Sequence, residues 1–120
     1  MIYHVVPLDE WLAIPDRPYS PGSLAGEGFT HCSPDEATTL AVASAYYRKT
    51  PGPLMALLIN PEKLDVPVRW EAAGSTPWPG MEPDTLFPHV FGPIRREAVE
   101  GMMEIVRDES GRATGFAVWS

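Results

Sequence analysis

Three histidines, His4, His31 and His89, have the side-chain type best suited to acid–base chemistry in this chain. Each lies beside a proline or glycine that signals a turn, at a predicted strand end or before a predicted helix, and ligand-binding residues often occupy such places. Imidazole, with an ordinary pKa of about 6.5, both donates and accepts protons near neutral pH. The three positions favour one shared site, and local packing of each histidine is the alternative interpretation.

A zinc ion and an activated serine or cysteine are the other chemistries that these residues suggest. Three histidines and a water make a catalytic zinc site, but the long intervals between these histidines lack the short ligand spacing of zinc motifs. Ser33 has no G-x-S-x-G elbow around it, and Cys32, near a predicted helix N-terminus, is expected to be a small buried residue. The sequence therefore predicts no metal and no serine or cysteine nucleophile.

One carboxylate and three aromatic side chains complete the candidate set. Glu71 lies next to a long proline-rich loop, where it either acts as a base, holds a sugar hydroxyl or is a solvated charge at a strand end. Tyr19 and Trp78, each in a proline-rich segment, are the aromatics least easily explained by packing, and either suits stacking on a planar ligand ring. Phe29, close to His31, belongs to such a platform, to the core, or to both.

Strands and helices must position these residues, and hydrophobic periodicity predicts a mixed set. Strands are expected over residues 2–6, 54–60, 66–72, 87–91 and 116–119. Helices are expected over 8–13, 34–49 and 95–107. Loops are expected over 14–28 and over 74–93, and the strand over 87–91 interrupts the second loop. The strand over 54–60 is apolar on both faces, which is typical of a central, doubly covered strand. The order of elements indicates an α+β fold with two main helices.

The first main helix has the sharpest local signal. Ser33 is expected to cap it, Pro34 suits its first turn, and Glu36 completes a capping box. Its inner face is expected along Ala37, Leu40, Ala41, Ser44 and Tyr47. The second main helix is predicted from an apolar stripe at helical spacing, formed by Ala98, Val99, Met102 and Val106.

Composition indicates a folded protein and excludes several classes of partner. The 120 residues suffice for a single domain over residues 1–120. The net charge of −7, from 9 Lys and Arg against 16 Asp and Glu, disfavours nucleic acid and anionic membranes as partners. One cysteine excludes an internal disulfide. The first residues lack the pattern of a signal peptide, so a cytoplasmic protein is expected.

Four blocks of sequence form a recognisable pattern: Ile2-Tyr3-His4, Tyr19 to Leu24, Glu27-Gly28-Phe29-Thr30-His31-Cys32-Ser33, and Phe87-Pro88-His89-Val90-Phe91-Gly92-Pro93-Ile94. The pattern resembles a small bacterial family described as domain of unknown function 952. The blocks occur in the family's order across nearly the whole chain, and the last two are fairly specific.

The resemblance implies a fold and a ligand class. By fold, the family is grouped with the ADP-ribosyltransferases and the RNA 2′-phosphotransferases, which implies a split, twisted mixed sheet with a cleft for NAD or a related ligand. In that larger group a first-strand histidine contacts the ribose, an aromatic stacks on nicotinamide, and a later polar residue completes the site. His4 matches the first role, His31 lies at the second motif, and His89 or Glu71 fits the third.

The function hypothesis joins the residues to the resemblance. A small-molecule ligand, either NAD as substrate or another ADP-ribosyl or phosphorylated compound, is expected to bind at His4, His31 and His89, with group transfer in which the last two move protons. Further ligand contacts are expected from Tyr19, Phe29, Ser33 and Trp78. The alternatives are binding of a small metabolite without turnover and a protein-interaction domain that uses the loop over residues 74–83.

Overall fold

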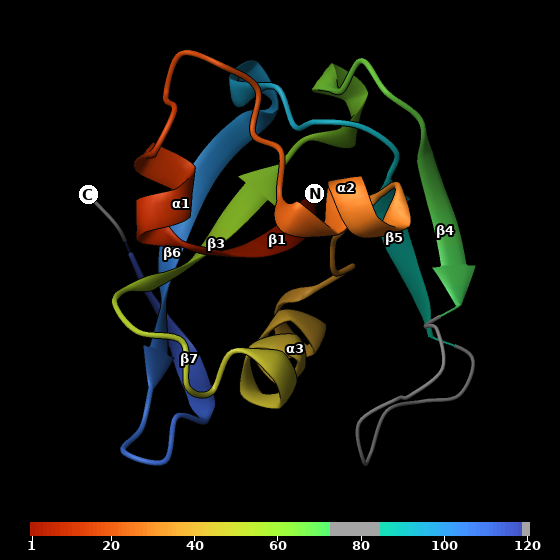
Figure 1. Ribbon diagram of the computed structural model, residues 1–120. Helices are drawn as coiled ribbons and strands as arrows, with labels where there is room; N and C mark the ends of the chain where they lie inside the picture. Colours follow the sequence, from red (N-terminus) through yellow and green to blue (C-terminus); the bar gives the residue numbers. More distant parts are fainter. Residues whose placement is uncertain (73–84, 119–120) are drawn as a thin grey trace.

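The computed structural model describes residues 1–72 and 85–118 and contains two sheets. The four-stranded sheet has the order β1-β3-β6-β7, with β1 at Ile2–Pro7, β3 at Leu54–Ile59, β6 at Val99–Arg107 and β7 at Ala113–Val118. The three-stranded sheet has the order β2-β5-β4, with β2 at Thr30–His31, β5 at Leu86–Val90 and β4 at Val68–Ala72. In Figure 1, β4 and β5 lie at the right, beside the four-stranded sheet.

Short helices connect the strands. They are α1 (Leu8–Leu12), α2 (Gly22–Glu27) and α3 (Glu36–Tyr46), with 3₁₀ turns η1 (Pro61–Lys63) and η2 (Arg96–Ala98). The α+β class predicted from the sequence is confirmed. Every strand pairing among the described residues is antiparallel, so the expected mixed sheet is wrong.

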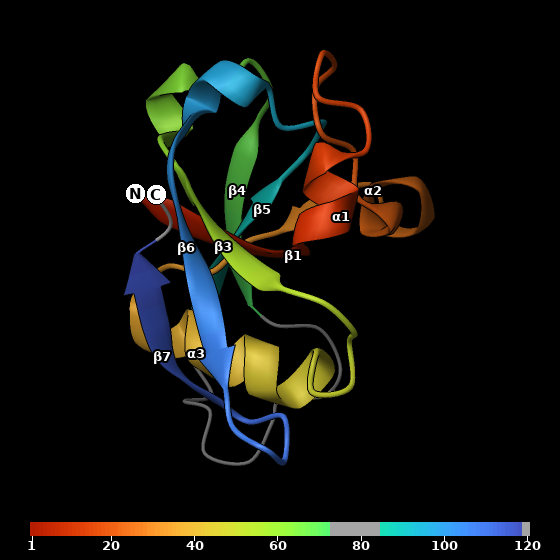
Figure 2. The same ribbon diagram turned by 90° about the vertical axis from the view of Figure 1, so that its left-hand side faces the viewer.

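Strand β3 lies at the centre of the core because both of its faces are covered. Met55 and Leu57 point to an apolar cluster that joins the two sheets and includes Val90 of β5. The alternate residues Leu54 and Ala56 point to a second cluster, in which α3 packs. Figure 2 shows α3 behind β6 and β7. The sequence prediction of a doubly covered central strand is therefore confirmed.

The second main helix does not form, since Arg96–Ala98 make the turn η2 and Val99–Arg107 are strand β6. This strand pairs with β3 along residues 99–104 and with β7 along residues 103–107, so it forms sheet hydrogen bonds on both edges. Val99, Ile105 and Val106 are β-branched and suit a strand, and Gly101 weakens a helix. The helical spacing of the apolar residues is outweighed by these two pairings.

Asp35, not Ser33, caps α3, and the helix begins at Glu36. The Asp35 carboxylate accepts a hydrogen bond from the backbone N–H of Thr38 at 2.7 Å. Ser33 instead exchanges backbone hydrogen bonds of 2.7 and 2.9 Å with Tyr3 of β1. The chain entering α3 is thereby tied to β1. The buried residues of α3 are Thr39 and Ala43, so its inner face is rotated from the expected one.

Part of the expected loop before His31 forms helix α2. Gly28 ends this helix with φ +85°, and its N–H donates to the Leu24 carbonyl. Residues with a side chain rarely adopt this left-handed conformation, which explains a glycine at the helix end. The turn leads directly from Glu27 through Phe29 into β2, and this places His31 beside β5.

Candidate functional site

His31 and His89 lie side by side on one face of the three-stranded sheet. They are partners in the register of β2 with β5, so their side chains leave the same face. Their ring centroids are 5.5 Å apart, with the ring planes at 80°. The fold thus brings together two of the three histidines that the sequence nominates, although a long segment separates them along the chain.

Phe29 covers this pair of histidines. Its ring stacks on His89, with centroids 4.2 Å apart and planes at 24°, and it meets His31 edge-on at 4.8 Å. The ring of Phe91 lies 5.3 Å from Phe29. We call the surface formed by Phe29, His31, Glu71, His89 and Phe91 the histidine face.

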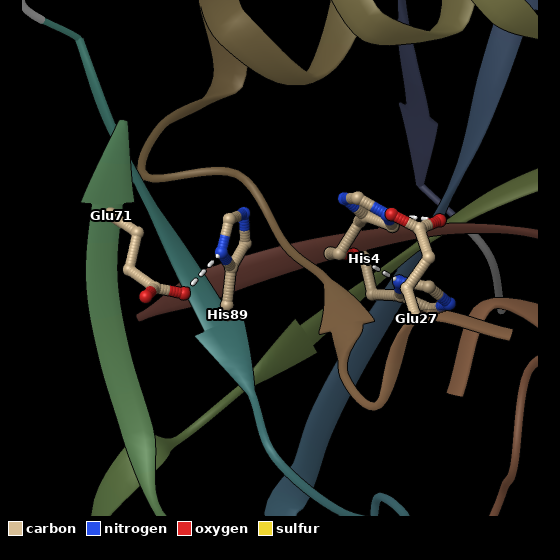
Figure 3. A network of polar contacts seen from close by, with 5 residues as sticks. His4, Glu27, Glu71 and His89 are labelled. Carbon is tan, nitrogen blue, oxygen red and sulfur yellow. Dashed lines mark hydrogen bonds and ion pairs between the residues drawn. The ribbon is translucent and has the colours of Figure 1, made fainter. Parts of the chain in front are cut away.

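Each of the two histidines is held by its own carboxylate. Nδ1 of His89 lies 2.8 Å from Oε1 of Glu71, and Figure 3 shows Glu71 reaching from β4 to His89 on β5. Nε2 of His31 lies 3.1 Å from Oε1 of Glu27. An ionised carboxylate only accepts hydrogen bonds, so the bonded nitrogen carries the proton in both pairs. Nε2 of His89 and Nδ1 of His31 are then the ring nitrogens that do not bind a carboxylate.

The two pairs differ in exposure. The side chain of His89 is only 8% exposed and that of Glu71 is 44% exposed, whereas His31 and Glu27 are 52% and 55% exposed. Solvent weakens an open ion pair, so Glu27 holds His31 less firmly than Glu71 holds His89. The enclosed and oriented imidazole of His89 is the stronger candidate for proton transfer at a fixed position.

Glu27 is a member of the site that sequence reasoning missed. It stands four residues before His31, a spacing that brings two side chains together on a helix. The helix ends between them at Gly28, so the contact depends on the left-handed turn and not on helix geometry. The available signal was the short block from Glu27 to His31 in the family pattern.

His4 joins the histidine face through the backbone. Its Nδ1 donates to the carbonyl oxygen of His31 at 2.6 Å, which holds β2 against β1. The His4 ring packs 5.7 Å from the ring of Tyr19. Burial lowers the pKa of His4 to about 4, so its imidazole is neutral at pH 7. Nε2 of His4 has no hydrogen-bond partner among the described residues.

The remaining predicted contacts lie away from this face or outside the described residues. Tyr19 is 6% exposed and its hydroxyl donates to Glu10 at 3.1 Å, so packing explains it, contrary to the sequence expectation. Ser33 is buried in the bridge to β1. Cys32 is buried as expected, and burial raises the pKa of its thiol. Trp78 and the loop over 74–83 lie outside the described residues.

An open groove of about 690 Å³ lies apart from the candidate residues. Its lining comes from residues 48–50, 52–54 and 104–111, at the end of α3 and at the turn between β6 and β7. Within it, Arg107 donates to the backbone carbonyls of Tyr47, Thr50 and Gly52. That guanidinium therefore holds the loop after α3 in place and is engaged by the protein itself.

A family model described as "Protein of unknown function (DUF952)" matches residues 5–102. The chain belongs to the DUF952 family. Among solved structures, the crystal structure of protein CC0527 from Caulobacter crescentus matches with a TM-score of 0.75 and 22% identity, covering 94% of this chain and 92% of that one. A double mutant of CC0527 matches with the same TM-score and 21% identity. At such identity the likeness shows the fold alone. No curated protein matches the chain.

The DUF952 match confirms the family resemblance and leaves its wider implications as predictions. The matched region begins after His4 and includes the whole histidine face. The descriptions of the similar proteins name no ADP-ribosyltransferase and no ligand. No helix among residues 1–72 and 85–118 combines the length and the apolar character needed to cross a membrane.

The arrangement of the histidine face suits acid–base chemistry, and the described part of the chain holds no metal ligand set. No three His, Cys, Asp or Glu side chains there are placed to hold a metal ion together. Two adjacent imidazoles, each oriented by a carboxylate, can instead serve as proton donor and proton acceptor. The aromatic rings beside them supply apolar surface that suits a planar or sugar-like group.

Proposed function

We propose that this protein binds a small ligand on the histidine face and promotes group transfer or hydrolysis through proton transfer by His89 and His31. The observation that carries the proposal is the pair of neighbouring imidazoles, 5.5 Å apart, each hydrogen-bonded to its own carboxylate. A carboxylate fixes which nitrogen of a histidine carries the proton and stabilises the imidazolium that forms during transfer. Glu71 has this role toward His89, and Glu27 has it toward His31.

The proposed chemistry follows from the two nitrogen atoms that the carboxylates leave available. Nε2 of His89 accepts the proton of an attacking hydroxyl or water while the bond to the leaving group breaks. A protonated His31 donates to a leaving group that needs a proton. For NAD, the ligand that the family resemblance implies, the bond between ribose and nicotinamide breaks, and the acceptor oxygen adds to the ribose carbon and loses its proton.

His4 supports this proposal as a positioning residue. Its hydrogen bond to the His31 carbonyl fixes the backbone that carries one of the two imidazoles. A direct contact with a ribose hydroxyl, which the resemblance implies, would use Nε2 of His4. Of the other ligand contacts expected from the sequence, Phe29 lies on the histidine face, and Trp78 remains a prediction within the same proposal.

Binding without turnover is the second candidate, and the enclosure of His89 favours it. Phe29 covers one face of the His89 ring, and the side chain is only 8% exposed. A ligand that rests against Phe29 and Phe91 would then touch the imidazoles at their edges. In that case the histidines supply hydrogen bonds to the ligand and no proton is transferred.

The test measures binding and product formation on the same samples. NAD and ADP-ribose are titrated by calorimetry, and nicotinamide release from NAD is followed by chromatography. We expect release to fall at least about a hundredfold in His89→Ala, which is the usual loss for an acid–base residue. Glu71→Gln should show a smaller loss, and Glu100→Gln, which removes an exposed carboxylate paired with Lys63, is the matched control.

The outcomes separate the two candidates. Binding of NAD with no product, weakened in His89→Ala, supports binding without turnover. Equal release by the wild type and His89→Ala would place the chemistry elsewhere and overturn the catalytic proposal. If neither compound binds, NAD and ADP-ribose are excluded as ligands of this face.

A further inference from the structure

Arg69 extends the row of His31 and His89 onto the third strand of the small sheet. His89 on β5 has two register partners. One is Arg69 on β4, and the other is His31 on β2. Side chains of register partners leave the same face of a sheet, so the three form one row across β2, β5 and β4. The guanidinium carbon of Arg69 lies 5.1 Å from the centre of the Phe91 ring, which belongs to the histidine face.

Arg69 is an exposed residue, and its guanidinium has no hydrogen bond or ion pair with the described residues. Other arginines are engaged by the protein, since Arg96 and Arg107 each donate to three backbone carbonyls. The two carboxylates of the candidate site, Glu71 and Glu27, hydrogen-bond to His89 and His31. In a chain with a net charge of −7, Arg69 is thus a cation that the described residues leave unpaired, held against the Phe91 ring in the same row as two imidazoles.

We propose that this row binds a phosphate group of the ligand, with Arg69 as the principal contact. The inference rests on the proposed function, because it assigns a ligand class to the same face. A guanidinium offers parallel N–H groups whose geometry matches two oxygens of one phosphate. Neighbouring strands lie about 4.8 Å apart, so a phosphate bound by Arg69 lies close to the position of His89 on β5. Phe29 and Phe91 then face the organic group that carries the phosphate.

The experiment uses phenyl phosphate, which joins a planar ring to a phosphate, and benzyl alcohol as its uncharged counterpart. Each is titrated into the ¹⁵N-labelled full-length protein, and NMR shifts of the histidine face report binding. We expect phenyl phosphate to shift the signals of Phe29, His31 and His89. Arg69→Gln should weaken binding about tenfold, as expected for loss of a charge-assisted hydrogen bond at an exposed site.

Two further variants control for charge and geometry. Arg69→Lys keeps the charge but loses the fork, so its affinity should lie between that of the wild type and Arg69→Gln. Arg112→Gln removes an exposed positive charge next to β7, and it should bind phenyl phosphate like the wild type. This pair distinguishes a local contact from an effect of net charge.

The outcomes separate the phosphate inference from the proposed function. Equal affinity of Arg69→Gln and the wild type would overturn the role of Arg69 and leave the proposed function standing. Equal affinity for benzyl alcohol and phenyl phosphate would overturn the phosphate assignment alone. Shifts from neither compound at the histidine face would count against both the inference and the proposed site.

Discussion

The Nδ1 atom of His4 donates a hydrogen bond to the backbone carbonyl of His31, with a distance of 2.6 Å between nitrogen and oxygen. This contact joins the first strand of the large sheet to the first strand of the small one. A carbonyl oxygen only accepts, so Nδ1 of His4 carries the proton. The histidine is enclosed by the core, and its neutral form is the one that the fold stabilises.

The first prediction concerns the dependence of stability on acid. Burial lowers the pKa of His4 in the folded state to about 4 from its ordinary value of 6.5. Between these values the unfolded chain binds a proton that the folded chain does not, so stability rises with pH. The His4 contribution is complete above pH 6.5 and is lost as the pH falls toward 4, with a total of about 3 kcal/mol.

Two measurements check this dependence. NMR titration of the His4 ring should give its pKa directly, and urea unfolding at several pH values should show the loss of stability. His4→Asn keeps a side-chain N–H donor but does not titrate, so the part of the acid dependence due to His4 should vanish. His31→Asn, at an exposed histidine, is the control that should keep most of the acid dependence, because burial is the main cause of the low pKa of His4. A His4 ring that titrates near 6.5 would contradict the prediction.

The second prediction is that Glu71 selects the tautomer of His89. In the wild type the neutral imidazole should carry its proton on Nδ1, because that atom faces the carboxylate at 2.8 Å. Glu71→Ala should convert this single tautomer to a mixture of the Nδ1-H and Nε2-H tautomers, which ¹⁵N shifts of the ring report. The cost in stability should stay below about 1 kcal/mol, since Glu71 is half exposed. Glu100→Ala is the control, and an unchanged tautomer in Glu71→Ala would refute the assignment.

The third prediction compares two glycines with nearly the same backbone conformation. Gly28 and Gly111 have φ of +85° and +87°. A Cβ at Gly28 would meet nothing within 4 Å, whereas at Gly111 it would overlap the backbone oxygen of Arg48. Gly28→Ala should cost about 1 kcal/mol from backbone strain alone. Gly111→Ala should cost at least about 3 kcal/mol, because backbone must also move. Equal losses of unfolding free energy in the two variants, measured by chemical denaturation, would exclude the steric contribution at Gly111.

The sequence predicts best those elements that its own local pattern determines. The apolar run of β3 identifies a strand with two covered faces, and the proline after Val6 marks the end of β1 within one residue. Strand β6 escapes prediction because its apolar residues also fit a helix, and only the partners β3 and β7 decide the outcome. The α+β class is recovered even though one of its two expected main helices is a strand.

For the candidate site, the sequence predicts the residues but not their arrangement in space. His31, His89 and Glu71 are nominated by residue type and by their positions next to turns. Their arrangement depends on the register of three strands, which no local pattern shows. For that reason sequence reasoning overlooks Arg69 as a neighbour of His89, and it finds Tyr19 hard to explain by packing although the fold buries it.

The last prediction tests which residue begins helix α3. The sequence suggests a capping box of Ser33 and Glu36, whereas in the structure the Asp35 carboxylate accepts from the N–H of Thr38 at 2.7 Å. Asp35→Ala should therefore cost about 1 kcal/mol of unfolding free energy, the usual value of an N-cap. Glu36→Ala removes a neighbouring, exposed carboxylate in the first helical turn, where the helix dipole favours it, so it should cost no more than about 0.5 kcal/mol. A larger loss in Glu36→Ala than in Asp35→Ala, measured by urea denaturation, would restore the capping box and shift the helix start toward Ser33.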